Sequence, residues 1–302
     1  MNDLTHITVI GAGLMGHGIA QVFAQAGCDV VVYDPAPTSL ATLHDRIADN
    51  LRDLDQPLEA LRQIHPSADL AASVATADYI VEAAVESLEV KRDLFRQIEA
   101  AAKPDAILAS NTSVIPITEI MRDLAHPERA LGTHWWNPPF LVPLVEVIGT
   151  RWTRPVVLEQ TLDLHRRIGK IPVHVRKDVP GFIGNRLQHA LWREAIALVE
   201  QGICDAETVD TVVKASFGRR LGVLGPLENA DLVGTDLTLA IHRTILPTID
   251  HRPAPSPYLE QLVADGRLGM KSGAGFRRWS ADQQAALRAR VFASLRASLA
   301  QP

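Results

Sequence analysis

Apolar runs and amphipathic segments alternate over the first half of the chain. The apolar runs are rich in β-branched residues and predict strands at residues 6–10, 29–33, 77–84 and 106–110. After the first run, apolar residues at helical spacing predict a helix that ends at Gly27, and a later helix begins at Pro116. Val90, Leu94 and Ile98 predict the apolar face of a helix between them. Strands that alternate with helices in this way predict a parallel sheet.

The pattern changes in the second half. Residues 130–136 and 142–148 predict two further strands, separated by an Asn-Pro-Pro sequence that cannot continue a strand and forces a turn. From Gly181 onward only helical spacing remains. It predicts helices from about Asn185 to Gly202, at 206–215, at 231–246 and after Ser280, with a proline-rich loop at 251–257. The chain therefore divides into an α/β part and a smaller all-α part.

Composition and charge exclude several classes of protein. A chain of 302 residues that is 47% apolar can bury a large core, in two domains. The net charge is -5 and no block of Lys or Arg occurs, so nucleic-acid and membrane partners are not expected. The first predicted strand leaves no room for a signal peptide, and no apolar run is long enough to span a membrane. Two distant cysteines, Cys28 and Cys204, fit a reducing cytoplasm and offer no metal site.

A glycine-rich turn follows the first predicted strand. Its sequence is Gly11-Ala12-Gly13-Leu14-Met15-Gly16, and the second predicted strand ends at Asp34. In this pattern the glycines allow a tight turn, close approach of the backbone to a pyrophosphate, and helix packing, while the acid accepts hydrogen bonds from a ribose. We therefore predict an N-terminal Rossmann-type dinucleotide-binding domain at 1–179 and an all-α domain at 180–302. Asp34, with no arginine after it, favours NAD over NADP.

Polar residues follow the later strands, where ligands bind in such sheets. They are Glu86, Asn111 and Ser113, and each is equally compatible with a loop or capping role. A stronger signal comes from the two strands around the Asn-Pro-Pro turn. If they pair antiparallel about residue 140, His134 and Glu146 lie directly opposite each other on one face. A buried glutamate beside a histidine orients the ring, so the pair is a candidate general base.

Seven ordered motifs now identify a family that the chain resembles. From residue 6 to about 279 it is similar to the 3-hydroxyacyl-CoA dehydrogenases. The motifs are the glycine-rich turn, Val81–Lys91, Ser110–Ser113, the His-x-x-Asn-Pro run with LVEVI, Lys177–Leu187, Gly225–Asp236 and Gly266–Phe276. The resemblance implies a homodimer formed through the helical domain, and it makes residues 280–302 an added packing or interface segment.

The resemblance also implies roles for individual residues. His134 is the catalytic base and Glu146 its partner, while Ser113 and Asn185 hold the reacting oxygen. The expected cofactor-binding set is Gly11, Gly13, Leu14, Met15, Gly16, Asp34, Glu86, Lys91 and Asn111. NAD is the expected cofactor. The expected activity is reversible oxidation of a 3-hydroxyl to a 3-keto group.

Other functions remain open at this point. The decarboxylating β-hydroxyacid dehydrogenases share the glycine-rich opening but use a lysine where this chain has Asn185, and a non-catalytic NAD-binding protein would be expected to lack the His-Glu pair. The substrate is a further alternative. CoA-using relatives carry lysines in the segment that matches residues 36–76, but this chain has no lysine there. The segment contains three arginines and six acidic residues, so its net charge is negative. The Asn-Pro-Pro form also resembles relatives that act on gulonate or a pyridine carboxylate, and carnitine is a comparable non-CoA substrate. We therefore expect poor use of CoA thioesters.

Overall fold

A computed structural model describes residues 4–299, which form two compact units. Within the described residues, the first unit comprises residues 4–186 together with 294–299, and the second comprises residues 187–293. The outermost residues of the two predicted domains, 1–3 and 300–302, lie outside the described residues. The end of the last helix thus clusters with the first unit, although it follows the second in sequence.

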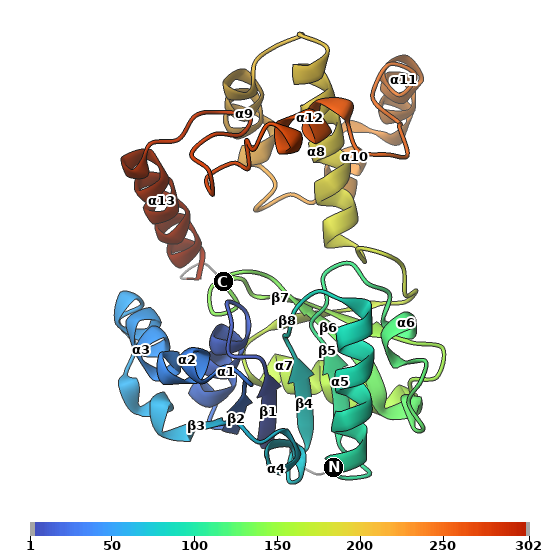
Figure 1. Cartoon of the computed structure of the whole chain (residues 1–302). Coiled ribbons are helices and arrows are strands. Elements are labelled where there is room, and N and C mark those ends of the chain that lie inside the picture. Colours follow the sequence, from blue (N-terminus) through green and yellow to red (C-terminus); the bar gives the residue numbers. More distant parts are fainter. Residues whose placement is uncertain (1–3, 300–302) are drawn as a thin grey trace. The chain divides into compact units, whose positions relative to one another are not determined.

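The first unit is built on a sheet that has eight strands within residues 4–299 (Figure 1). The strands are β1 (His6–Ile10), β2 (Asp29–Tyr33), β3 (Ile64–Ser67), β4 (Tyr79–Glu82), β5 (Ile107–Ser110), β6 (Ala130–Trp135), β7 (Leu144–Gly149) and β8 (Ile171–Val175). Their spatial order is β3-β2-β1-β4-β5-β6-β7-β8. Neighbouring strands are parallel except β6 and β7, which are antiparallel. The prediction of a mainly parallel sheet is confirmed.

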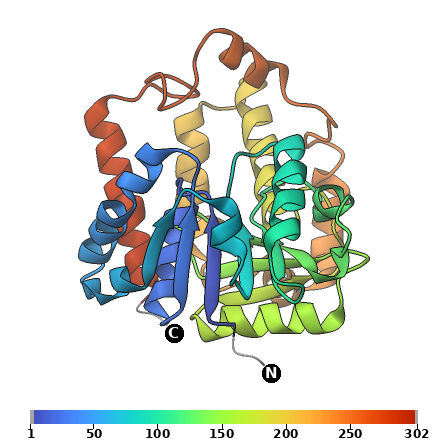
Figure 2. The ribbon, with the colours of Figure 1, turned by 60° about the horizontal axis from the view of Figure 1, so that its bottom comes forward.

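Helices cover both faces of this sheet and bury a separate apolar cluster on each. One face packs against α1 (Gly16–Gln25), α3 (Leu43–Asp53) and α7 (Pro155–Arg167), the last of which is yellow-green in Figure 2. The opposite face packs against α4 (Leu70–Val74), α5 (Leu88–Ala101) and α6 (Ile117–Met121). A short helix, α2 (Pro37–Ala41), precedes α3, and 3-10 turns lie at Leu58–Gln63 and Pro127–Arg129. Since both faces are covered, the central strands are buried on both sides and mostly apolar.

Several elements of this unit do not appear in the sequence-based prediction. They include the helices α2, α3, α4 and α7 and the strands β3 and β8. Both strands lie at the outer edges of the sheet and carry a proline, Pro66 or Pro172, which weakens the sequence signal of a strand. The strand predicted at 77–84 is also shorter in the structure, because residues 83 and 84 begin the loop that carries polar residues, and β5 begins one residue later than predicted.

The predicted apolar face of α5 was wrong in part. Its buried residues are Lys91, Phe95 and Ile98, whereas Val90 is 44% exposed. Leu94 is partly buried against the core cluster as predicted, and together with Val90 it also lines a cavity on the first unit. The position of Val90 therefore reflects a surface that can cover a ligand, which periodicity does not distinguish from a surface that packs on the core.

The second unit is helical. Its helices are α8 (Gly184–Glu200), α9 (Ala206–Ala215), α10 (Pro226–Val233), α11 (Thr235–Ile245) and α12 (Pro257–Ala264), with a 3-10 turn at Phe217–Arg219. Residues 184–186 of α8 cluster with the first unit. The single helix predicted at 231–246 is wrong, because Gly234 has φ +99° and separates α10 from α11. This conformation suits glycine and ends a helix.

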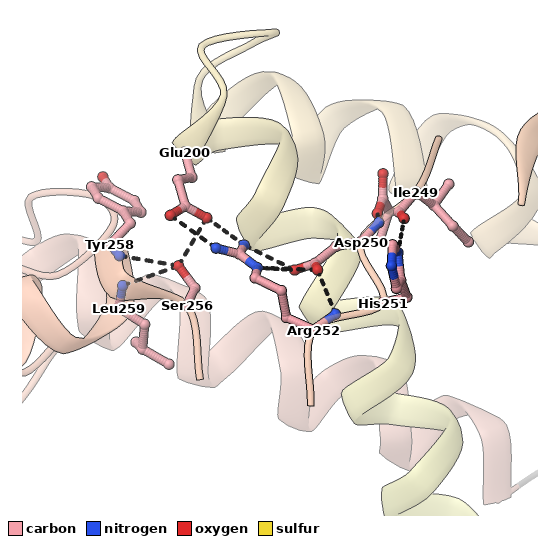
Figure 3. Close-up of polar contacts among 9 residues, drawn as sticks. Glu200, Ile249, Asp250, His251, Arg252, Ser256, Tyr258 and Leu259 are labelled. Carbon is pink, nitrogen blue, oxygen red and sulfur yellow. Dashed lines mark hydrogen bonds and ion pairs between the residues drawn. The ribbon is translucent and has the colours of Figure 1, made fainter. Parts of the chain in front are cut away.

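An arginine fixes the proline-rich loop of the helical unit (Figure 3). The Arg252 guanidinium donates to Glu200 at the end of α8, over 2.5 and 3.2 Å, and to both oxygens of Asp250. These bonds hold the pKa of Asp250 down to about 2. Ser256 donates to Glu200 and accepts the Tyr258 N–H, so it also caps α12. The loop is thereby tied to both α8 and α12.

The last helix is α13 (Ala281–Leu299). Ser280 caps it as predicted, because its hydroxyl accepts the Gln283 N–H at 3.2 Å. Near the other end, Arg296 donates to the Asp53 carbonyl at 2.9 Å and pairs with Asp55 at the end of α3. Across residues 4–299, none of the helices combines the length and the apolarity that a membrane span requires.

Candidate functional site

The glycine-rich turn connects β1 to α1 as predicted, and its glycines differ in what surrounds them. A Cβ at Gly16 would lie 1.7 Å from the Gly11 carbonyl oxygen, and one at Gly11 would lie 2.8 Å from the Ala83 carbonyl oxygen. A Cβ at Gly13 would meet nothing within 4 Å. Gly11 and Gly16 are therefore required by the fold, whereas Gly13 leaves open space beside a helix N-terminus, where a pyrophosphate binds.

A cavity of about 680 Å³ opens beside this turn. Its lining includes Gly11, Gly13, Asp34, Val85 and Glu89. The volume is adequate for a nucleotide, and the lining combines a glycine-rich turn with an acid at the end of β2. These residues fit the adenosine half of NAD.

Asp34 organises the mouth of this cavity. One of its carboxylate oxygens accepts the Ala12 N–H and the other accepts the Ala36 N–H, both at 2.8 Å. Each oxygen has a second lone pair, so ribose hydroxyls can still be accepted. Arg46, which the sequence did not single out, donates to the Ala12 carbonyl at 2.7 Å from the neighbouring helix α3. No motif spacing signals this contact, because it joins segments that meet only in the fold.

The strand register places the predicted base and its partner together. β6 and β7 pair with His134 directly opposite Glu146. His134 Nδ1 lies 2.7 Å from Glu146 Oε2, and the side chains are 5% and 1% exposed. The other oxygen of Glu146 accepts the N–H groups of Ile183 at 2.8 Å and Gly184 at 3.0 Å. The predicted pairing is confirmed, and the structure adds a link to the start of α8.

This environment determines the charge on Glu146. Burial acts to raise the pKa of Glu146, but the hydrogen bonds from His134, Gly184 and Ile183 outweigh it and lower that pKa below its ordinary value. With Glu146 ionised, His134 Nδ1 carries the proton and donates it to the carboxylate. His134 Nε2 is then left with a lone pair that can accept a proton.

Two loops bring further polar groups to this place. The Asn185 side-chain amide donates to the Ser113 carbonyl at 2.9 Å, so the loop after β5 meets the first turn of α8. Asn111 lies deeper, and its side-chain oxygen accepts the Trp135 N–H at 2.8 Å. Ser113 and Asn185 are thus at the surface of the site, while Asn111 connects the ends of β5 and β6.

The predicted residues Glu86 and Lys91 belong to a network at the end of β4. Lys91 Nζ lies 2.6 Å from Glu82 and 3.3 Å from Glu86, and its side chain is 1% exposed. Glu86 accepts the Thr112 hydroxyl at 2.6 Å and the Ser113 N–H at 2.9 Å. Lys91 therefore acts on the loop through Glu86. Sequence reasoning missed Glu82, whose place inside an apolar strand is a signal that could have identified it.

The two tryptophans after His134 lie on opposite faces, as strand alternation predicts. Trp136 packs on the His134 ring at a centroid distance of 5.2 Å. Trp135 packs instead against Phe23 and His165 in the core. Burial lowers the pKa of His165 to about 4, so this second histidine stays neutral and enclosed. Of these two histidines, His165 is therefore enclosed in the core and His134 is the one at the candidate site.

Comparisons with known proteins agree with this geometry. The model of the NAD-binding domain of 3-hydroxyacyl-CoA dehydrogenase matches residues 6–179, and the model of the C-terminal domain of the same enzymes matches residues 181–279. Together they match most of the chain, and the junction between them falls within the Lys177–Leu187 motif. The predicted division at residues 179 and 180 differs by several residues from the division into compact units.

The similar proteins act on different kinds of substrate. A 5-formyl-3-hydroxy-2-methylpyridine 4-carboxylate 5-dehydrogenase from Mesorhizobium japonicum is 36% identical, covering 95% of this chain and 94% of the relative. A probable 3-hydroxybutyryl-CoA dehydrogenase from Deinococcus radiodurans is 39% identical, covering 90% of this chain and 99% of the relative. Among solved structures, an NAD⁺-dependent dehydrogenase of the same pyridine carboxylate has a TM-score of 0.92 at 35% identity, covering 98% of this chain and 97% of the other. An (S)-3-hydroxybutyryl-CoA dehydrogenase from Ralstonia eutropha has a TM-score of 0.77 at 30% identity, covering 92% of this chain and 100% of the other.

The glycines of the turn lead to a paired prediction. Gly13→Ala should leave the melting temperature nearly unchanged, because its Cβ meets open space, but should weaken NADH binding by at least tenfold. Gly16→Ala should destabilise the fold by about 1–3 kcal/mol, because its Cβ meets backbone. Calorimetry for stability and titration calorimetry for NADH check both variants. Normal NADH affinity in Gly13→Ala would place the pyrophosphate elsewhere.

Proposed function

Since the chain belongs to the 3-hydroxyacyl-CoA dehydrogenase family, we propose that His134, Glu146, Ser113 and Asn185 form its catalytic set. The activity is the NAD-dependent, reversible oxidation of a 3-hydroxyl to a 3-keto group. The observation that carries the assignment is the 2.7 Å contact of His134 Nδ1 with a buried carboxylate, which leaves Nε2 as a base.

The mechanism follows from where the protons lie. NAD, when bound, supplies the acceptor for the hydride that leaves the alcohol carbon. As the carbonyl forms, His134 Nε2 takes the hydroxyl proton, and Glu146 stabilises the imidazolium that results. Asn185 uses one amide N–H on the Ser113 carbonyl and has a second for the reacting oxygen, and the Ser113 hydroxyl is a further donor. In the reverse direction His134 returns the proton.

The cofactor set of this proposal follows the geometry of the first unit. Gly11, Gly13, Leu14, Met15 and Gly16 form the turn that would hold the pyrophosphate, and Asp34 would hold the adenosine ribose. At the nicotinamide end of the cofactor, the loop after β5 would be held in place by Glu86, Lys91 and Asn111. We also place the enzyme in the cytoplasm, which the two free cysteines support.

The first prediction of this proposal concerns the base. His134→Ala should lower kcat by roughly 10² to 10⁴, as expected for loss of a general base, and should leave NADH affinity within about twofold. Glu146→Gln should lower kcat less, because it keeps a hydrogen bond to the ring but loses the charge. Steady-state kinetics and titration calorimetry measure the two effects. His126→Ala, which removes an exposed histidine elsewhere on the first unit, is the control. A His134→Ala enzyme with most of its turnover would exclude the assigned base.

The same proposal includes a homodimer formed through the helical unit. Apolar side chains around α10 are unusually exposed there: Val223 by 85%, Leu227 by 80% and Leu232 by 73%. A chain seldom leaves such a surface uncovered by a partner. A second copy of the helical unit would cover it, as the resemblance to dimeric relatives implies.

Sedimentation velocity tests this assembly. The wild-type protein should sediment as a dimer, and Leu227→Glu should shift it towards the monomer, because a charge would be buried at the interface. Leu58→Glu places the same change on an exposed leucine of the first unit and should leave the dimer intact. A Leu227→Glu protein that remains dimeric at low micromolar concentration would rule out this interface.

The substrate carries a separate prediction. The comparisons support the acyl-CoA type of reaction, whereas the charge of residues 36–76 disfavours CoA itself. Two of the three arginines in that segment are already engaged: Arg46 by backbone carbonyls and Arg52 by Asp49 at 2.7 Å. The phosphates of CoA would therefore have to compete with these partners for both guanidinium groups.

We predict a low kcat/KM for L-3-hydroxybutyryl-CoA relative to small free hydroxy acids or an aromatic carboxylate aldehyde. A panel assay that follows NADH formation at 340 nm with each substrate measures the difference. Increasing the salt concentration serves as a control, because screening should reduce repulsion of the thioester but change the smaller acids less. A kcat/KM near 10⁶ M⁻¹s⁻¹ for the thioester, well within the usual enzyme range, would contradict the prediction.

A further inference from the structure

A group of three charged side chains at the end of β4 has one more negative than positive charge. We infer that Glu86, the outermost of the three, strengthens binding of the oxidised cofactor relative to binding of the reduced one. The oxidised nicotinamide ring is a cation and the reduced ring is neutral. The inference rests on the proposed function, because it takes hydride transfer to occur beside His134 and Ser113.

The inner pair of this triad is fully enclosed. Glu82 and Lys91 are 0% and 1% exposed and lie 2.6 Å apart. Glu82 also accepts the Ala84 N–H at 2.7 Å and the Ser110 hydroxyl at 2.6 Å, so both of its oxygens are satisfied. The charges of the pair cancel locally. Glu86, 3.3 Å from Lys91 Nζ and 39% exposed, is the carboxylate left in excess.

Glu86 is ionised at neutral pH. Burial acts to raise the pKa of Glu86, but hydrogen bonds from Thr112, Ser113 and Lys91 together with the Lys91 charge lower it below its ordinary value. The single lysine is shared by two carboxylates. A net negative charge therefore stays at the rim of the triad.

The position of Glu86 places this charge near the reacting end of the cofactor. The nucleotide cavity reaches Val85, the residue before Glu86. On its other side, Glu86 accepts the N–H of Ser113, whose carbonyl is bound by Asn185. A dinucleotide that extends from the cavity to the carbon served by His134 has to pass Glu86. Its nicotinamide end, and not its adenosine end, lies on that side.

The two redox forms of NAD differ in charge only at the nicotinamide ring. A carboxylate near this ring attracts the cation and leaves the neutral form almost unaffected. A carboxylate near the adenosine acts equally on both forms, because that half is identical in them. The ratio of the two dissociation constants therefore reports charges near the nicotinamide ring, such as that of Glu86, and is insensitive to charges near the adenosine half.

The test is the binding of NAD⁺ and NADH to Glu86→Gln, measured by titration calorimetry on the full chain. Glutamine keeps an oxygen for the Ser113 N–H and the Thr112 hydroxyl but removes the charge. The dissociation constant of NAD⁺ should rise roughly tenfold while that of NADH stays within about twofold. For a two-electron couple, a tenfold change in this ratio raises the potential of the bound cofactor by about 30 mV.

Glu89→Gln is the matched control. Glu89 lies in the first turn of α5 and lines the nucleotide cavity, so its removal should change the two constants by the same factor. Glu86→Ala separates charge from positioning, because it also removes the acceptor for Ser113. Glu86→Ala should shift the ratio of the two dissociation constants as Glu86→Gln does. It should lower kcat more than Glu86→Gln, because the Ser113 loop loses its acceptor.

The possible results are distinct. A Glu86→Gln protein in which both constants change equally, or neither changes, overturns the inference and leaves the catalytic assignment intact. Full turnover in His134→Ala overturns the proposed function instead. A shift in the ratio for Glu86→Gln together with an unchanged ratio for Glu89→Gln supports the inference.

Discussion

One buried carboxylate, that of Glu146, connects the parts of the site. It receives the imidazole of His134 from the neighbouring strand and two backbone N–H groups from the turn that begins α8. An ionised group with so little solvent is tolerated only because each oxygen has donors. The same bonds set the tautomer of His134 and place Asn185, one residue further on, beside the Ser113 loop. The chemistry of the base and the start of α8 thus depend on the same side chain.

Carboxylates have the same role at other strand ends of the sheet. Asp34 joins the glycine-rich turn to the segment after β2, and Glu86 joins the loop after β4 to the loop after β5. In each case a side chain accepts N–H groups that would otherwise lack partners in a loop. These bonds arrange the loops before any ligand arrives. A carboxylate that is not neutralised by a cation can then act on the ligand. The excess of one negative charge around Lys91 therefore matters for function.

Several features were predictable from sequence because they depend on short-range rules. The glycine-rich turn, the strand before it and the acid after β2 follow one spacing rule and appear as expected. The His134 and Glu146 pairing followed from a turn at Asn-Pro-Pro and the two-residue period of strands. Errors arose where a local pattern has two possible meanings. Val90 shows helical spacing but lines a cavity, and one apolar stretch at 231–246 contains a glycine that divides it.

The sequence by itself determined the fold class, the cofactor turn and the pairing of base and acid. Each of these is encoded within about 30 residues, where steric rules and strand periodicity leave few alternatives. Only the tertiary structure decided what each charge touches. The contacts of Glu82 with Lys91, of Arg46 with the glycine-rich turn and of Glu146 with Gly184 join segments that meet through packing. Periodicity reports which face of an element is apolar. The partner of a buried charge depends on which elements pack together, since desolvation makes an ion costly until that packing supplies its donors.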